Sequence, residues 1–226
     1  MHDVNGPARR RRDPSMIDTP ITDRDDLTGI FTEVESDVAR RLIGSAVESF
    51  ARRGYHATTT RDISVGAGLS PAALYVHFKS KEEVLFEASR IGHQHVLDAV
   101  VAAAASATEP ADRMRAIVDG FVRTHAVHHT VCRVAQYELH ALTPEHYRTI
   151  AAIRRDTDAV IRAEIENGIA AGVFTVRDVP TTALAILSLG IDVARWYQPG
   201  RIDVDTLAGN YVELVLGMLG AGTMQG

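Results

Sequence analysis

The 226-residue sequence predicts an all-α fold of about nine helices, with an N-terminal three-helix helix-turn-helix domain and a larger helical body. Three observations support this prediction. Apolar residues recur at helical spacing along most of the chain. No region alternates polar and apolar residues over several strands, and no repeat of fixed period occurs. Breaks divide the later sequence into segments of helical length, near Glu109–Pro110, Thr143–Pro144, Asp178–Pro180 and Gln198–Gly200.

The composition indicates an ordinary globular protein, with 46% hydrophobic and 23% charged residues. Cys132 is the only cysteine, which excludes an intramolecular disulfide framework and fits a reducing cytoplasm. The longest strictly apolar run, residues 99–105, is far too short to cross a bilayer. The N-terminal arginines are not followed by the apolar segment of a secretory signal. We therefore expect a cytoplasmic protein without a membrane partner.

The net charge of −5 argues at first against a nucleic-acid partner. Its distribution weakens that objection, because residues 36–95 are net positive while the segments on either side are net negative. Phosphate binding depends on local rather than total charge. The asymmetry is small, so it permits DNA binding without proving it.

Residues 1–35 are expected to be a mostly disordered tail, because they lack sustained periodicity and are rich in Asp, Arg, Pro and Thr. Within this tail, Arg9–Arg12 forms a basic cluster. The cluster is either an arm that reaches DNA phosphates or a minor groove, or a solvated segment with no fixed role. We expect the first folded domain to span residues 36–82 and the helical body to span residues 83–226.

The first helix is expected from Ser36 onward, because apolar residues then recur every four positions. Gly54 follows and suits the left-handed conformation that often ends a helix. The apolar positions are Val38, Leu42, Ala46 and Phe50.

Residues 57–87 contain three patterns that start helices. In two of them a hydroxyl residue is followed three positions later by an acid, as in a capping box. In the third, a serine precedes a proline at the first helical position. Together they predict a helix of just over two turns, a tight turn, a second short helix and the start of a long one. The patterns are Thr59 with Asp62, Ser70 with Pro71, and Ser80 with Glu83.

Gly68 lies where the first of these helices must end and the chain must reverse, a place that favours positive φ. Apolar residues on either side can close a small core between the two helices. The core candidates are Ile63, Ala67, Leu69, Leu74 and Phe78.

The second helix leaves small and hydrogen-bonding residues on its outward side, which suits DNA contact. Small side chains let the backbone approach base edges, and Tyr75 and His77 can donate to phosphate oxygens. Lys81 adds a charge beside the positive N-terminus of the next helix. This second helix, the expected recognition helix, contains no Arg or Asn for the usual bidentate base contact. Sequence recognition would then depend on small side chains, Arg61 and DNA shape.

The run TTTRDISVGAGLSPAALYVHFKSKEEVL resembles the N-terminal domain of the tetracycline-repressor (TetR) family. With Phe50 and Gly54–Tyr55, the resemblance covers about residues 36–95. It implies a dimeric, DNA-binding repressor whose C-terminal helices bind small molecules. Thr60 could instead only cap its helix, and Tyr75 and His77 could be ordinary, partly buried residues. By this resemblance, the candidates for DNA contact are Thr60, Arg61, Ser70, Ala72, Ala73, Tyr75, His77 and Lys81.

A histidine-rich stretch in the body is the main alternative for function. His125, His128, His129 and Cys132 form two pairs at i, i+4 spacing on one expected helix. The pairs point in different directions, and no tight metal-ligand motif accompanies them, so we expect neither a metal nor a cofactor. The alternative is a helical enzyme that uses this cluster. The pocket-lining candidates are His125, His129, Tyr137 and Trp196.

Two late apolar stripes predict a pair of helices that could form a four-helix interface between two subunits. Packing within one chain is the alternative. In a dimer, two recognition helices about 34–36 Å apart could occupy successive major grooves of a pseudo-palindromic operator. The interface candidates are Leu184, Leu187, Ile191, Leu207, Tyr211, Leu214 and Met218.

The R-W-Y-x-P-G element at residues 195–200 and the Y-x-x-x-x-L-G element at residues 211–217 are similar to actinobacterial TetR members that regulate lipid or sterol catabolism. Some of those members sense acyl-CoA thioesters. The similarity implies a lipid-derived or acyl-CoA effector. Alternatively, Trp196 and Tyr197 anchor the dimer interface or cap a helix. We expect the effector to tilt the long helix that begins near Lys81 and so to change the spacing of the recognition helices.

Overall fold

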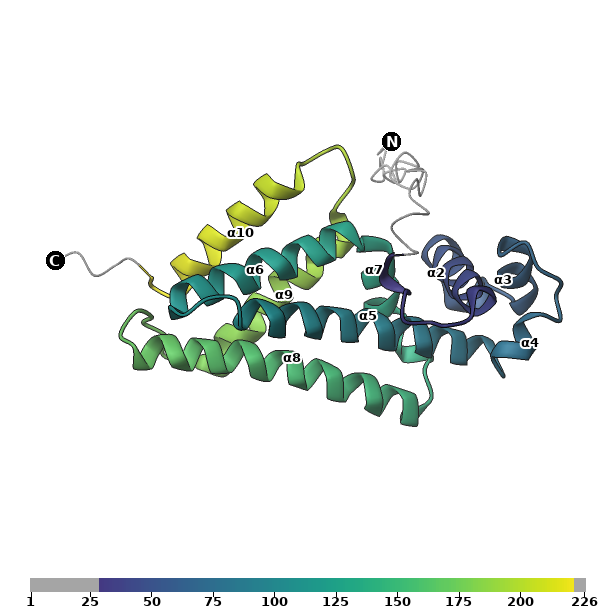
Figure 1. The fold of residues 1–226 in the computed structure, drawn as a ribbon, viewed down its shortest axis with the longest axis horizontal. Coiled ribbons are helices and arrows are strands. Elements are labelled where there is room, and N and C mark those ends of the chain that lie inside the picture. The colour runs from purple at the N-terminus through teal and green to yellow at the C-terminus, as the bar shows by residue number, and fades with distance from the viewer. Residues whose placement is uncertain (1–28, 222–226) are drawn as a thin grey trace, which may run out of the picture.

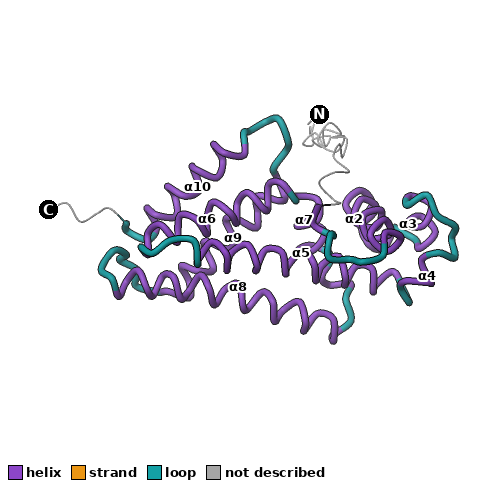
Figure 2. The backbone as a smooth tube through the Cα atoms, in the orientation of Figure 1, coloured by secondary structure: helices purple, strands orange, loops and turns teal. Residues whose placement is uncertain are grey.

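The computed structural model describes residues 29–221, and all regular structure within them is helical (Figures 1 and 2). This confirms the all-α prediction and its count of nine α-helices for this part of the chain. The helices are α2 (Asp37–Ala57), α3 (Thr60–Gly66), α4 (Leu74–His77), α5 (Lys81–Ala104), α6 (Pro110–Val127), α7 (His129–Tyr137), α8 (Pro144–Ala170), α9 (Val179–Trp196) and α10 (Val204–Met218), with a 3-10 turn, η2 (Leu139–Ala141).

Helices α2, α3 and α4 lie together at one end of the molecule (Figure 1). Helix α5 begins at that end and runs into the body, where α6 and α8 flank it. Helix α10 packs against α6, and α9 packs against α6, α7 and α8. Helix α5 therefore belongs to both ends of the molecule, which gives a direct physical link between them.

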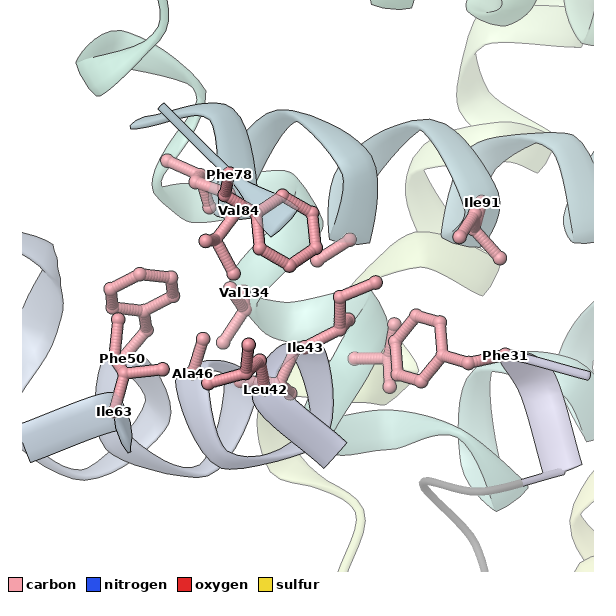
Figure 3. Packing of buried hydrophobic residues seen from close by; sticks show 14 of the residues in the cluster. Phe31, Leu42, Ile43, Ala46, Phe50, Ile63, Phe78, Val84, Ile91 and Val134 are labelled. Carbon is pink, nitrogen blue, oxygen red and sulfur yellow. The ribbon is translucent and has the colours of Figure 1, made fainter. Parts of the chain in front are cut away.

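The first hydrophobic cluster joins the three N-terminal helices to the start of the body (Figure 3). Phe50 and Ile63 pack at the N-terminal side, while Val84 of α5 and Val134 of α7 complete the same cluster. Each large apolar side chain buried in this way contributes about 1.5–3 kcal/mol relative to exposure. Packing is thus continuous across the boundary that we placed between residues 82 and 83, and the boundary itself stays a prediction.

The segment before α2 is more ordered than the sequence suggested. Ile30 and Phe31 are buried in the first cluster, and Phe31 is fully inaccessible (Figure 3). Glu33 forms an ion pair of 3.0 Å with Arg90 of α5. The predicted disordered tail is therefore too long at its C-terminal end. The basic cluster Arg9–Arg12 lies outside the described residues.

The predicted breaks before α6, α8 and α9 are confirmed, but one break was missed. Helix α6 ends at Val127 and α7 begins at His129, because the backbone of His128 leaves the helical region (φ −97°, ψ 33°). Neither glycine nor proline marks this break in the sequence. His125 and His129 consequently lie on different helices, which corrects the expectation that they share one helix face.

A second hydrophobic cluster fills the body between α6, α8, α9 and α10. Gly190 of α9 lies against the ring of Phe121, where any Cβ would overlap ring atoms. This close approach brings α9 and α6 together. None of the helices in residues 29–221 combines the length and apolar character needed to span a bilayer.

Candidate functional site

The start of α3 is fixed by a complete capping box, as the sequence predicted. Thr59 Oγ1 accepts a hydrogen bond from the Asp62 N–H (3.1 Å), and the Asp62 carboxylate accepts from the Thr59 N–H (2.9 Å). The Thr59 hydroxyl also donates to this carboxylate at 2.7 Å and is the main reason that the pKa of Asp62 is lowered. The box fixes where α3 begins relative to the end of α2.

The turn after α3 is built around Gly68, whose φ of +69° confirms the predicted left-handed position. The Gly68 N–H donates to the Val65 carbonyl and the Leu69 N–H donates to the Ser64 carbonyl, both at 2.9 Å. This pair of bonds is a Schellman motif, which satisfies carbonyls that the helix end leaves free. The Arg41 guanidinium donates to the Ala67 carbonyl and so ties the same turn to α2.

Close contact between α2 and α3 depends on a glycine that sequence reasoning missed. Ser45 Oγ donates a buried hydrogen bond of 2.8 Å to the Ile63 carbonyl. A Cβ at Gly66 would overlap this oxygen. Gly66 therefore permits the helix approach that orients α3.

The second short helix begins later than predicted. Residues 71–73 form a turn, α4 begins at Leu74, and its N-cap residue is Ala73, which has no capping side chain. Ser70 takes part through its carbonyl, which accepts from the Ala73 N–H at 3.0 Å. The side-chain cap expected at Ser70 is therefore not formed. The predicted small core is confirmed for Ile63, Ala67, Leu74 and Phe78, which are buried, and Leu69 packs against them.

The surface formed by α3, the turn and α4 exposes most of the predicted contact residues. The Tyr75 hydroxyl shares a hydrogen bond of 3.2 Å with Thr60 Oγ1, and this bond joins α4 to α3. Ala73 is partly buried. Val76 is 79% exposed, so it is the most exposed large apolar residue described, and the sequence analysis missed it. The exposed candidates are Arg61, Ser70, Ala72, Tyr75 and His77.

The ammonium group of Lys81 is bound within the chain, whereas we expected it to be free to bind a DNA phosphate. Its ammonium donates to the carbonyls of Tyr55 (2.7 Å) and Thr58 (2.6 Å) and lies 4.1 Å from the centre of the Tyr55 ring. Burial lowers the pKa of Lys81, an effect that the nearby Glu138 carboxylate opposes. Lys81 thus fastens the start of α5 to the end of α2.

The capping box predicted at the start of α5 is only half formed. Ser80 Oγ accepts from the Glu83 N–H at 3.1 Å, as expected. The Glu83 carboxylate, however, accepts from the Lys79 N–H.

The body contains a cavity of about 860 Å³ between α5, α6, α7, α8 and α9. Its inner wall is formed by buried residues such as Phe121, His125 and Cys132, whereas exposed Tyr147 and Arg155 mark its opening to solvent. A site of this volume, with mixed apolar and polar walls, is typical of small-molecule binding.

Two of the four predicted pocket residues line this cavity and two do not. His125 and Tyr137 are part of its wall. The centroid of the His129 ring instead lies 5.8 Å from that of the Tyr197 ring, and Trp196 packs against the second hydrophobic cluster. His129 and Trp196 are therefore not among the residues that line the cavity.

Sequence reasoning also missed His93 of α5 and two arginines of α8, Arg154 and Arg155, which line the cavity. The adjacent arginines were a weak signal, because basic pairs are common on solvated helix faces. Assigning them to a pocket requires knowing how five helices pack.

The four residues of the alternative catalytic cluster are divided between α6, the break at His128 and α7. The break at His128 separates His125 from His129, and the His128 ring lies against that of His95 with centroids 5.2 Å apart. Within the described residues, no group of three His, Cys, Asp or Glu side chains could hold a metal ion.

The predicted interface residues divide by exposure. Leu184, Leu214 and Met218 are exposed, at 62%, 59% and 41%. Leu187, Ile191 and Tyr211 are partly buried, and the first two also line the cavity. Leu207 is only 5% exposed and packs in the second cluster, so it is a core residue and its assignment to the interface was wrong. Leu189, 39% exposed, was missed.

Comparison with known proteins yields two family matches. Residues 42–88 match the family described as bacterial regulatory proteins, tetR family. Residues 107–219 match the tetracyclin repressor-like C-terminal domain.

Individual relatives agree with these matches. The HTH-type transcriptional repressor KstR2 of Rhodococcus jostii is 28% identical over 188 residues, which cover 82% of this chain and 92% of the relative. A crystal structure of a tetR-family regulatory protein from Rhodococcus RHA1 is 44% identical, with a TM-score of 0.79, covering 83% of this chain and 99% of that one. The ketosteroid regulator KstR2 of Mycobacterium tuberculosis is 28% identical, with a TM-score of 0.75, covering 82% and 96%.

Proposed function

Because the chain belongs to the tetR family of bacterial regulatory proteins, which are DNA-binding transcriptional regulators, we propose that it is a dimeric repressor released from its operator by a small molecule. The effector is mostly apolar and anionic, such as a lipid-derived acid or its acyl-CoA thioester. The observation that carries the effector class is the large cavity with two arginines of α8 in its wall.

The exposed surface of α3 and α4 supports the assignment of DNA contacts. Thr60, Arg61, Tyr75 and His77 supply the hydroxyl, guanidinium and imidazole groups that bind phosphate oxygens. Ser70, Ala72, Ala73 and Val76 are small or apolar, and a Val76 methyl suits contact with a thymine methyl. Since Lys81 is engaged within the chain, its contribution to DNA binding is to position the N-terminus of α5.

The cavity wall supports recognition of an anion. Arg154 donates to the Gln136 side chain at 2.6 Å, which uses one of its five N–H donors. Arg162 is paired with Asp158 at 2.7 Å. Arg155 is exposed at the cavity opening, with no partner given by the described residues. Arg155 and the remaining donors of Arg154 can therefore bind a carboxylate or phosphate.

Contacts at the N-terminal end of α8 offer a route from the cavity to the DNA-binding surface. His146 stacks on Phe86 with centroids 3.8 Å apart, and its Nδ1 lies 2.8 Å from the Glu82 carboxylate. Glu82 also accepts from the Thr143 N–H at 2.8 Å. Helix α8 carries the cavity arginines, so a shift of α8 on effector binding would move the first turn of α5. Lys81, in that same turn, would transmit the shift to α2.

The exposed apolar residues of α9 and α10 support dimerisation. Leu184, Leu189, Leu214 and Met218 are all more than one-third exposed. Large exposed apolar side chains gathered on two helices favour association with another subunit. Helices α9 and α10 from two subunits would form a four-helix interface and hold two DNA-binding surfaces at a fixed separation.

Gel-shift titrations of the full chain with the intergenic DNA upstream of its gene test the DNA-binding proposal. We expect a sequence-specific complex whose affinity falls steeply with salt. Arg61→Ala should weaken specific binding and reduce the slope of log K against log salt by about one, because the guanidinium is proposed to bind phosphate oxygens. Arg177→Ala, an exposed arginine in the loop after α8, should change neither. Absence of a specific, salt-sensitive complex would contradict the proposal.

A further inference from the structure

The cavity wall contains two histidines, one from each of two packed helices. His93 belongs to α5 and His125 belongs to α6. His125 is only 5% exposed, so the cavity is the solvent-accessible space that its ring can reach. The two imidazoles therefore present polar atoms to the cavity.

Backbone hydrogen bonds fix the tautomer of both rings. Nδ1 of His93 lies 2.8 Å from the Ser89 carbonyl, and Nδ1 of His125 lies 2.8 Å from the Phe121 carbonyl. A carbonyl oxygen only accepts, so each Nδ1 must carry the proton. Burial lowers the pKa of each histidine to about 4, so both rings are neutral near pH 7. Each Nε2 consequently holds a lone pair and acts as an acceptor.

Neither Nε2 has a hydrogen-bond partner among the described residues. The hydrogen bonds found for the two rings are those of their Nδ1 atoms. Arg154 is the charged neighbour that further lowers the pKa of His93, and its guanidinium donates a hydrogen bond to Gln136. Electrostatic interaction with His93 and His128 further lowers the pKa of His125. In the part of the chain that the structure describes, no group of three ligating side chains surrounds the pair.

We infer that the effector carries a hydroxyl group, which donates a hydrogen bond to Nε2 of His93 or His125 while its anionic group lies near Arg154 and Arg155. The inference rests on the proposed function and makes the effector class narrower: a hydroxylated, lipid-derived acid or thioester. A ketone at the same place would bring its oxygen, which only accepts hydrogen bonds, against the two Nε2 atoms, which are also acceptors. A plain hydrocarbon would leave both Nε2 atoms buried without a donor. A site built to bind a hydroxyl rejects analogues that lack one.

Three matched acids test the inference by calorimetry with the full chain: dodecanoic, 11-hydroxydodecanoic and 11-oxododecanoic acid. They share length and carboxylate and differ at one carbon. We expect the hydroxy acid to bind at least tenfold more tightly than the oxo acid. His93→Leu and His125→Leu should each reduce this ratio, and the double variant should bring it to within about threefold of unity. His129→Leu, outside the cavity, should preserve it. Equal ratios in wild type and double variant would overturn the inference.

The tautomers are tested separately, without a ligand. Two-bond ¹⁵N–¹H spectra of the ¹⁵N-labelled full chain at pH 7 should show the Nδ1–H form for two histidines whose signals vanish in the two single variants. Observation of Nε2–H or of imidazolium at these positions would overturn the inference.

The two proposals can fail independently. If all three acids release operator DNA but bind equally, the hydroxyl inference fails and the proposed function stands. If the hydroxy acid binds selectively but DNA is not released, the proposed function fails, and only the selectivity of the cavity for a hydroxyl group stands. If none of the acids binds, the acid effector class of the proposed function fails, and with it the hydroxy-acid ligand. The NMR spectra still decide whether the histidines are acceptors.

Discussion

The DNA-binding end and the cavity-bearing body are built by different kinds of interaction. Between Thr59 and Phe78, a capping box and a Schellman turn join residues close in sequence. Longer links from Arg41 and Ser45 of α2, and the bond between Thr60 and Tyr75, hold these short helices together. The cavity instead draws its wall from five helices spread over about a hundred residues. A short surface must present a constant shape to DNA, whereas a cavity made of separate helices can change its shape when they shift.

The largest predicted effect concerns Leu74, the buried side chain that holds α4 in the DNA-binding end. Helix α4 has four residues, and Leu74 is its one fully buried side chain. Leu74→Ala should cost about 2–5 kcal/mol locally. Because α4 makes few other contacts, we expect loss of operator binding while ligand binding in the cavity persists.

Hydrogen exchange and calorimetry on the Leu74→Ala variant measure the two ends separately. Ile161→Ala in the second cluster is the matched control, because it should loosen the body first. Equal loss of protection at both ends in both variants would mean that the two ends unfold as one unit.

Acid should destabilise the cavity wall before the DNA-binding end. The pKa values of His93 and His125 are lowered to about 4 by burial, against 6.5 for an unburied histidine. Between these values the unfolded chain binds more protons, so stability is full above pH 6.5 and is lost as pH falls toward 4. Each histidine can contribute up to about 1.4 kcal/mol per pH unit.

Denaturant titrations from pH 7.5 to pH 4 measure this loss. His125→Leu should flatten the dependence. A wild-type stability that stays constant from pH 6.5 to pH 4.5 would argue against buried, neutral histidines.

A pair of glycine substitutions in the N-terminal unit isolates the approach of α3 to α2. Gly66→Ala introduces a methyl group that overlaps Ser45 Oγ, and we expect a loss of about 1–3 kcal/mol. Gly44→Ala meets no atom within 4 Å in the interior of α2. That control should be neutral or stabilising by about 0.5–1 kcal/mol. Thermal unfolding of both variants decides, and equal shifts of Tm would contradict the close packing.

The smallest predicted effect comes from removing the N-terminal cap of α3. Thr59→Ala deletes the hydroxyl that bonds Asp62 in both directions, and about 1 kcal/mol of stability should be lost. Thr59→Ser should retain most of it. Circular dichroism during urea unfolding can measure the difference, and indistinguishable midpoints for Ala and Ser would show that the capping box contributes little.

Features that depend on nearby residues were predictable from the sequence. The hydroxyl at Thr59 and the acid at Asp62 stand three positions apart, and Gly68 lies between two apolar runs, so α3 and its turn could be inferred directly. Features that depend on distant residues could not be inferred in this way. Gly66 matters only because Ser45 lies opposite, and His93 becomes a cavity residue only once α5 packs against α6.

Three other errors have similar physical causes. The break at His128 involves no glycine or proline, so helix periodicity gave no warning of it. Phe31 lies within a polar segment, and its burial depends on the surface that α2 and α5 present together. Leu207 shares the apolar spacing of the exposed residues on α10, and only the packing of α10 against α6 separates the two sets.

We propose that occupancy of the cavity lowers the affinity for operator DNA. Fluorescence anisotropy on a labelled operator, titrated with 11-hydroxydodecanoic acid, tests it most directly in wild type and in Arg155→Ala. We expect the acid to weaken operator binding by roughly thirty- to more than a hundredfold in wild type, a coupling of about 2–3 kcal/mol. Arg155→Ala should need far more acid for the same effect while binding DNA normally without it. An operator affinity that stays unchanged while calorimetry shows the cavity filled would contradict the claim.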